Sequence, residues 1–497
     1  MATHLHGTQP ILPPTAPQPL AGSWRQLEPK RLSLSLLTAL VIGSMIGSGI
    51  FSLPQNMAAS AGAGAILIGW LITGVGMLSL ALVYQTLSSR QPTLDNGVFA
   101  YARALGGEFL GFNSAWGYWI SAWVGNVSYM VILFSALSFF FPLFGEGNNK
   151  AAIVGASVVL WSLHWMILRG MRTAAKANAL TTLAKVVPLL LFIGLVIAAF
   201  QRKTFMVDFW SSPALGSTLD QVKSTMLVTV WVFIGIEGAN VFSARAAERV
   251  NVGRATVIGF VITLLLLIAV SLLSLGILGQ PELATLKNPS MAGVLEAVVG
   301  PWGAMLISIG LIISVGGALL AWTLLAAESI FTPAKEKVMP GTLAMESTRG
   351  VPANALWITN GCIQLFLLLT LYSSATYLTL ISLATSMILL PYLFSGLYAL
   401  KLTWQGQTYA GHRGLQLRDM AIASVATLYC LWLLYAAGPK YMLLSALLYA
   451  PGSLIYLGTM KARQGQALNG PETGLLIIIW VAAAIAGWML WSGALAL

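Results

Sequence analysis

The sequence is poor in charged residues. Only 8% of its 497 residues are Asp, Glu, Lys or Arg, whereas an ordinary soluble domain carries about 25%. A water-soluble chain of this length could not cover its surface with so few charges, so a soluble multidomain enzyme is excluded. The 57% of hydrophobic residues and a mean hydropathy of +0.82 instead indicate an all-α integral membrane protein with many spanning helices.

Cysteine and histidine are also scarce. Cys362 and Cys430 lie in separate apolar runs, with neither a disulfide framework nor a metal-ligand spacing. Of the four histidines only His164 lies in an apolar run, and the lack of a nearby carboxylate favours an interfacial side chain. The runs contain no metalloprotease, paired-carboxylate or nucleophile-elbow motif. The chain is therefore predicted not to be an enzyme, with no catalytic residue, no metal and no cofactor.

Thirteen apolar stretches are long enough to cross about 30 Å of hydrocarbon. They lie at 33–60, 62–87, 105–141, 151–169, 177–200, 222–244, 255–279, 301–330, 353–371, 376–400, 419–437, 440–459 and 473–495. The tightest connection is the turn at 437–440. The polar gaps at 331–351 and 402–418 have room for at most a short amphipathic helix each. Residues 1–32 are Pro-rich without an apolar run, which predicts a disordered tail.

The net charge of +11 does not indicate nucleic acid, because Lys and Arg lie mainly in short gaps between the apolar runs. Alternate gaps hold 19 basic residues on one side and 6 on the other, and Lys185 inside a run completes the 26. The positive-inside rule then predicts a cytoplasmic N-terminus and a C-terminus on the outside.

The first apolar run contains three glycines and two serines within Gly43–Gly49. Gly43 and Gly47 have the spacing of a helix-packing pair. Packing needs one small face, however, whereas Gly47, Ser48 and Gly49 spread around the helix. We therefore favour an unwound segment, whose free backbone N–H groups could hold a carboxylate.

The sixth run contains a second signal, Gly235-Ile236-Glu237-Gly238. A glutamate deep in a span costs roughly 2.5–3.5 kcal/mol on insertion scales, and the flanking glycines indicate another broken helix. The two breaks occupy matching places in two five-span halves. Such a pair is typical of the binding site of an inverted-repeat transporter.

Three further polar or aromatic residues lie within spans. Lys185 is expected to face a cavity or a partner rather than to reach the membrane surface, because it lies about nine residues inside its run. Asn126 must find hydrogen-bond partners, and structural packing and substrate contact are equally open for it. Trp322 lies inside the eighth run, where packing is the simpler explanation among 17 tryptophans.

These motifs together resemble the amino acid–polyamine–organocation superfamily, in particular its basic amino acid/polyamine antiporters. The segments that carry the resemblance are Ile46–Phe51 with Leu53-Pro54, Phe233–Glu237, Tyr118-Trp119 with Trp123–Asn126, and Trp322–Ala326. The string Pro54–Ala58, Lys185 and a thirteenth span are most similar to arginine/ornithine antiporters. The match covers about 33–460 without large insertions.

The resemblance implies a LeuT-like fold of two inverted five-helix repeats with discontinuous first and sixth helices. The repeats would comprise 33–200 and 222–400, with additional helices at 419–495 and the tail at 1–32. It implies a multi-pass protein of the bacterial inner membrane. Small cationic amino acids and the lipid bilayer would be its partners, a homodimer is allowed, and nucleic acid is not expected.

The resemblance also assigns roles at a site in the membrane midplane. The backbone of Gly47, Ser48 and Gly49 would bind the substrate carboxylate, and carbonyls near Ile46, Trp231 and Ile234 its amino group. Trp231 and Trp322 would cover the substrate, and Tyr118 and Asn126 would line the distal subsite. Glu237 would act in gating, whereas Lys185 would occupy the place of a sodium ion and so argue against sodium coupling.

The implied activity is exchange of L-arginine for L-ornithine by alternating access. Departures from close relatives at Ser44 and at Ser121-Ala122, and an unresolved choice between Ser382 and Thr385, bear on the side-chain contacts. Three alternatives stay open: a proton-coupled or uniport permease for lysine or arginine, an antiporter for another amino acid and its decarboxylated amine, and a sensor or scaffold subunit.

Overall fold

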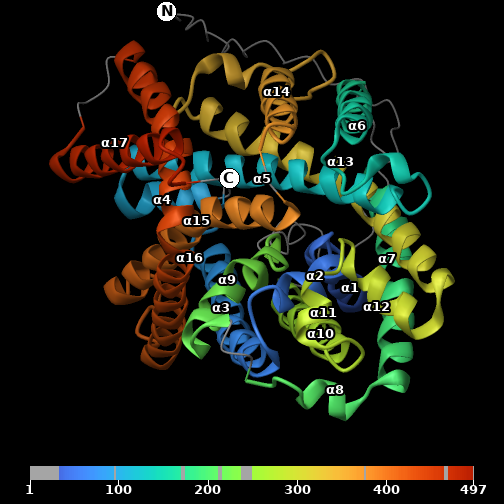
Figure 1. Cartoon of the computed structure of the whole chain (residues 1–497). Helices are drawn as coiled ribbons and strands as arrows, with labels where there is room; N and C mark the ends of the chain where they lie inside the picture. Colours follow the sequence, from blue (N-terminus) through green and yellow to red (C-terminus); the bar gives the residue numbers. More distant parts are fainter. Residues whose placement is uncertain are drawn as a thin grey trace, which may run out of the picture.

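The computed structural model describes residues 33–94, 97–169, 174–210, 215–236, 249–373, 376–463 and 468–495. Throughout these ranges the regular elements are helices (Figure 1). They are α1 (Leu34–Met45), α2 (Gly49–Ala58), α3 (Ala63–Arg90), α4 (Gly97–Gly106), α5 (Glu108–Leu137), η1 (Pro142–Phe144), α6 (Lys150–Leu168), α7 (Ala174–Ala199), α8 (Arg202–Met206), α9 (Thr218–Trp231), α10 (Arg249–Ser274), α11 (Gln280–Ala284), α12 (Ser290–Val299), α13 (Pro301–Lys335), η4 (Gly341–Ala344), α14 (Ala353–Leu369), α15 (Tyr377–Gln405), α16 (Arg413–Ala462) and α17 (Gly470–Trp491).

Eight helices in the described part of the chain are long and apolar enough to cross a membrane, and the bent pair α1 and α2 would make a ninth. This number is lower than the thirteen predicted spans for local reasons. α16 joins two predicted spans across a kink at Gly438, whose φ of 71° and ψ of 173° are not helical. Three further predicted spans are shorter than the 18 residues that a span needs: α9 has 14 residues, α14 has 17, and α7 contributes only its Lys185–Ala199 part. The total of thirteen stays a prediction.

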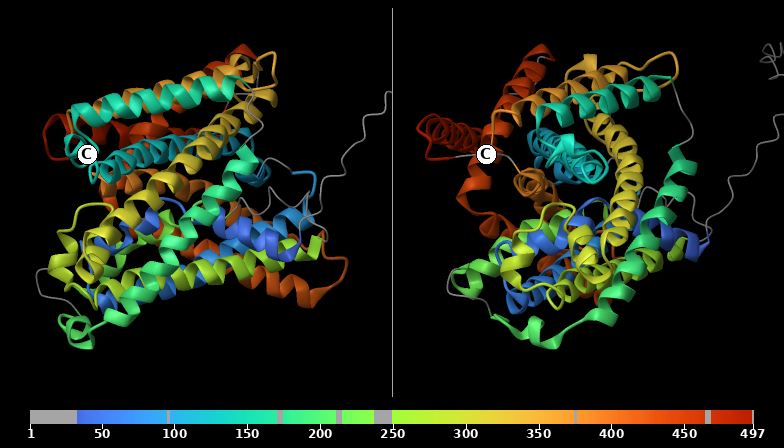
Figure 2. Two further views of the ribbon diagram at one scale, coloured as in Figure 1. Left: turned by 90° about the vertical axis from the view of Figure 1, so that its right-hand side faces the viewer. Right: turned by 45° about the vertical axis from the view of Figure 1, so that its right-hand side comes forward.

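α5 forms the centre of the molecule. Its most apolar stretch is 94% buried, whereas that of the peripheral α17 is only 11% buried. Figure 2 shows α5 running through the interior, with α6 and α14 on one side and α1, α2 and α10 on the other. Because helices inside a bilayer gain little from hydrophobic burial against one another, close packing and hydrogen bonds must hold this arrangement.

Two short helices that hydropathy did not reveal, α11 and α12, cover the end of α2. The side-chain amide of Gln280 donates to the carbonyl of Ala58 at 2.6 Å. The backbone N–H of Gln55 donates to the Ser290 hydroxyl at 3.0 Å. The last carbonyls of a helix have no partner within it. The Gln280 contact therefore provides a partner for one of these carbonyls, and both contacts hold the end of α2 against α11 and α12.

Basic residues from several gaps gather at one end of the helices. Arg103 forms an ion pair with Glu336, and the Arg463 guanidinium donates to the Lys337 carbonyl at 2.6 Å. The Lys401 ammonium donates to the carbonyl of Leu105 at 3.0 Å. The charge pattern had assigned all four basic residues to the same side, and their contacts agree with that assignment.

A polar cluster ties the end of α3 to the start of α16. The buried Asp419 carboxylate accepts hydrogen bonds from Arg90 at 3.3 Å and from the Tyr409 hydroxyl at 3.0 Å. The Arg90 guanidinium also lies 3.5 Å from the centre of the Tyr409 ring. Burial, reinforced by the Asp419 carboxylate, raises the pKa of Tyr409 to about 12, so its hydroxyl keeps its proton and remains a donor.

Removing the Asp419 carboxylate should destabilise the protein strongly. Asp419→Ala removes a buried acceptor shared by the Tyr409 phenol and the guanidinium groups of Arg90 and Arg418, which costs about 3 kcal/mol. The matched control is Lys335→Ala, which breaks the exposed ion pair with Glu346 and should cost at most about 1 kcal/mol. Thermal unfolding of the purified variants in detergent measures the loss of stability in each variant. Equal melting temperatures for the two variants would contradict a role for the cluster.

Candidate substrate site

The break predicted in the first apolar run is present. α1 ends at Met45 and α2 begins at Gly49, the two axes differ by 47°, and residues 46–48 are not helical. Glycine and serine are poor helix formers, which explains the position of the break. The backbone N–H groups of Gly47 and Ser48 have no backbone acceptor among the described residues. They are free to bind an acceptor from outside the chain.

Lys185 fills the other half of this break. Its buried ammonium donates to the carbonyl oxygens of Gly43 at 2.6 Å and Ile46 at 2.7 Å. In an unbroken helix these carbonyls would accept from Gly47 and Ile50 four residues later. The ammonium therefore replaces the hydrogen bonds that the break removes, and it ties α7 to the end of α1.

A second helix ends beside the first break. α9 ends at Trp231, and residues 232–236 form turns. Gly235 has a φ of +106°, and a Cβ there would lie 3.1 Å from the Ser44 carbonyl and 3.5 Å from the Trp322 ring. The end of the first half of the sixth span thus meets the break in the first span. Residue Glu237, predicted to act in gating, lies outside the described residues.

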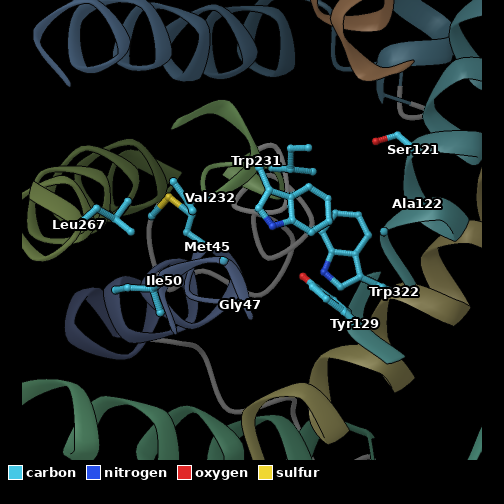
Figure 3. A pocket seen from close by; sticks show the side chains of 13 residues that line it. Met45, Gly47, Ile50, Ser121, Ala122, Tyr129, Trp231, Val232, Leu267 and Trp322 are labelled. Atoms are coloured by element: carbon cyan, nitrogen blue, oxygen red, sulfur yellow. The ribbon is translucent and has the colours of Figure 1, made fainter. Parts of the chain in front are cut away.

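A small cavity lies between these two helix ends (Figure 3). Its volume is about 20 Å³, which is room for about one water molecule. No charged side chain is among the described residues that line it, so its electrostatic character comes from aromatic rings and backbone dipoles. The lining residues are Met45, Gly47, Gly49, Ile50, Ser121, Ala122, Gly125, Tyr129, Trp231, Val232, Ile234, Leu267 and Trp322.

Three aromatic side chains line the cavity. In Figure 3 the indoles of Trp231 and Trp322 lie next to each other, with Tyr129 beside them. The rings of Trp231 and Tyr129 are 5.8 Å apart and meet edge to face at 64°. Glycines make the space for Trp231, since a Cβ on Gly49 would lie 2.9 Å from its ring and one on Gly125 would lie 3.0 Å from it.

The structure brings together five of the nine predicted substrate-binding residues. Gly47, Gly49, Trp231, Ile234 and Trp322 line the cavity.

The other four predicted substrate-binding residues are not among those that line the cavity. The carbonyl of Ile46 accepts from Lys185, and the Ser48 hydroxyl lies 3.0 Å from the Tyr377 hydroxyl. The Asn126 side chain donates to the Thr323 hydroxyl at 3.3 Å, while its own carbonyl oxygen has no partner within the described chain. Tyr118 is buried elsewhere along α5.

Sequence reasoning missed Tyr129. The signal was present, because Ala122, Gly125 and Tyr129 follow one another at intervals of three and four residues and so share one face of α5. The alternatives Ser382 and Thr385 are both buried on α15, and neither lines the cavity.

His164, for which the sequence favoured an interfacial position, is buried within the protein. It is fully buried between α6 and α14, where Asn360 lies 2.9 Å from its Nδ1 and the Trp357 ring centre lies 4.1 Å from its own. Its role is in packing. Within the described chain no group of three His, Cys, Asp or Glu side chains is placed to hold a metal ion.

Comparison with known proteins assigns the family. Residues 32–456 match the amino acid permease family model. The chain belongs to the amino acid permease family. This permease is 56% identical over 477 residues to an arginine/ornithine antiporter of Pseudomonas aeruginosa, covering 94% of this chain and 99% of that one.

Two more distant relatives of the permease carry other names. An L-lysine transport protein of Corynebacterium glutamicum is 43% identical over 92% of this chain and 94% of its own. An arginine/agmatine antiporter of Chlamydia pneumoniae is 41% identical over 88% and 91%. All three relatives are named for cationic amino acids.

Removing the Lys185 ammonium should destabilise the broken helix of the permease. Lys185→Met keeps the length of the side chain but leaves two buried carbonyls unpaired, and we expect a loss of about 2 kcal/mol in unfolding free energy. Lys401→Met is the matched control, since its exposed ammonium also contacts two carbonyls, which water can solvate. Thermal unfolding in detergent compares the stabilities of the Lys185→Met and Lys401→Met proteins. A Lys185→Met protein as stable as Lys401→Met would contradict the role given to the ammonium.

Proposed function

We propose that the protein exchanges cationic amino acids across the membrane, taking up L-arginine and releasing L-ornithine by alternating access. The observation that carries the proposal is the aromatic cavity at the two helix ends, in a chain 56% identical to an arginine/ornithine antiporter. Transport rather than covalent chemistry fits a cavity whose described lining offers rings, backbone groups and small side chains.

The cavity lining favours a cation that must also be released. A cation over an indole gains about 0.5–2 kcal/mol, which is enough to select and weak enough to dissociate. Trp231 and Trp322 supply the two indoles, and the carboxylate of the substrate would bind the free N–H groups of Gly47, Ser48 and Gly49. Its amino group would bind carbonyls near Ile46 and Ile234; the Ile46 oxygen keeps one lone pair beyond its contact with Lys185.

The distal part of the substrate would lie against α5. Ser121, Ala122 and Tyr129 line the cavity there, and we infer that they set the side-chain subsite. Tyr118 and Asn126 would join the subsite only after rearrangement, because Asn126 is held by Thr323 beside Trp322. A substrate that engages Asn126 would therefore also shift Trp322.

Alternating access requires the cavity to grow, since an amino acid cannot enter room for about one water molecule. Trp231 is suited to act as the gate because it is the last residue of α9 and is followed by turns. We place Glu237 in the same gating segment, as the resemblance implies. The Lys185 ammonium between two carbonyls would occupy a cation position, which argues against sodium coupling.

The architecture that we propose is two inverted five-helix repeats, 33–200 and 222–400, with further spans at 419–495. It is supported by the helix ends at Met45 and Trp231, each in the first span of its half. With thirteen spans the N-terminal tail 1–32 would lie in the cytoplasm and the C-terminus outside the bacterial inner membrane. Exchange of arginine for ornithine moves one positive charge each way, so the membrane potential would neither drive nor oppose it.

Uptake of labelled arginine into proteoliposomes tests the exchange. We expect uptake into vesicles loaded with ornithine and almost none into empty vesicles, with lysine and agmatine as the other internal substrates. Equal uptake into empty vesicles would refute exchange and support the uniport or proton-coupled alternative. Binding of arginine without any flux would instead support a sensor or scaffold.

The Trp322 indole should contribute to substrate affinity. Trp322→Ala removes one of the two rings, and we expect the half-saturating arginine concentration to rise about tenfold, which corresponds to roughly 1.4 kcal/mol. Trp302→Ala is the control, because Trp302 lies on the same helix with half of its surface exposed. Unchanged exchange by a folded Trp322→Ala protein would remove this residue from the site.

A further inference from the structure

A second cavity lies away from the substrate site, at the end of the helices where the basic residues gather. It is an open groove of about 530 Å³ between the end of α13 and the second half of α16. Figure 1 shows this part of α16, in red-orange, beside the gold segment that follows α13. The lining residues are Ala334, Lys337, Met339, Pro340, Gly341, Ile455, Gly458, Thr459, Ala462 and Arg463.

The groove is lined mostly by apolar and small residues. Two of them, Gly341 and Gly458, form a part without side chains that is here called the floor. A Cβ added to Gly458 or to Gly341 would meet no atom within 4 Å. Ile455, one turn before Gly458, is 36% exposed on the same wall. The groove therefore has space for an apolar chain lying along the second half of α16.

One end of the groove, here called its mouth, is positively charged. Arg463 joins its two walls, because its guanidinium donates to the Lys337 carbonyl at 2.6 Å and contacts the Glu108 carboxylate at 3.3 Å. The Arg463 side chain remains 35% exposed. Lys337 adopts a left-handed conformation with a φ of 62°, which turns its carbonyl toward Arg463 and leaves its side chain exposed.

Most charges nearby are already balanced. Arg103 pairs with Glu336 and Glu108, and Lys335 pairs with Glu346. The Glu472 carboxylate caps the start of α17 by accepting from the backbone of Asn469. Within the described chain the ammonium groups of Lys337 and Lys461 have no ion pair, so the mouth of the groove carries unbalanced positive charge.

We propose that this groove binds an anionic phospholipid, with the headgroup phosphate between Lys337 and Arg463 and an acyl chain over Gly458. Basic pockets between spanning helices on the cytoplasmic side bind anionic headgroups, and guanidinium groups bind phosphate through paired hydrogen bonds. A soluble anion would not use the apolar floor. A zwitterionic lipid would bring its own cation next to the two basic side chains.

Native mass spectrometry of the full-length protein in detergent tests the site with phosphatidylglycerol as the probe and phosphatidylcholine as the comparison. We expect a retained phosphatidylglycerol adduct that falls about tenfold in Gly458→Leu, which fills the floor, and in Lys337→Gln, which removes the free charge. Gly487→Leu is the matched control, since Gly487 on α17 also faces open space. Melting temperatures without lipid verify that the variants fold.

Three outcomes would overturn the proposal. Equal adducts in wild type, Gly458→Leu and Gly487→Leu would show that the lipid binds elsewhere. Equal retention of phosphatidylcholine would show that the charge has no part. Displacement of the adduct by inorganic phosphate at millimolar concentration would assign the basic mouth to a soluble anion. Because the assay measures binding alone, its result is independent of the transported substrate.

Discussion

The site depends on one interaction, the Lys185 ammonium between the carbonyls of Gly43 and Ile46. A helix broken inside a bilayer leaves acceptors on one side of the break and donors on the other, and lipid can satisfy neither. Lys185 uses the acceptors and brings a positive charge that their dipoles stabilise. The donors at Gly47 and Ser48 remain available, so the break presents a positive face to the cavity.

Trp231 connects this break to the second one. It is the last residue of α9, and its ring lies over Gly49 while its far edge rests against Gly125 of the central helix α5. The central helix α5 thus contacts one edge of the indole, and the start of α2 contacts the other. Three segments meet at one side chain, which explains why the cavity needs so many glycines.

Hydropathy and local composition predicted much of this structure. The apolar runs correspond to the long helices, and the Gly-Ser-Gly sequence located the break at 46–48 because the cause is local. The partners of Lys185 could not be predicted from the residues, since it contacts carbonyls 142 and 139 positions away. The same holds for Asn126, whose amide reaches Thr323 rather than the cavity. The helices α11 and α12 could not be predicted from hydropathy because, with five and ten residues, they are much shorter than a membrane span.

The small size of the closed cavity has a consequence for hydration. With room for about one water molecule, the closed form holds almost no solvent, whereas any form that admits an amino acid must fill with water first. Osmolytes too large to enter will therefore favour the closed form, because opening draws water away from them.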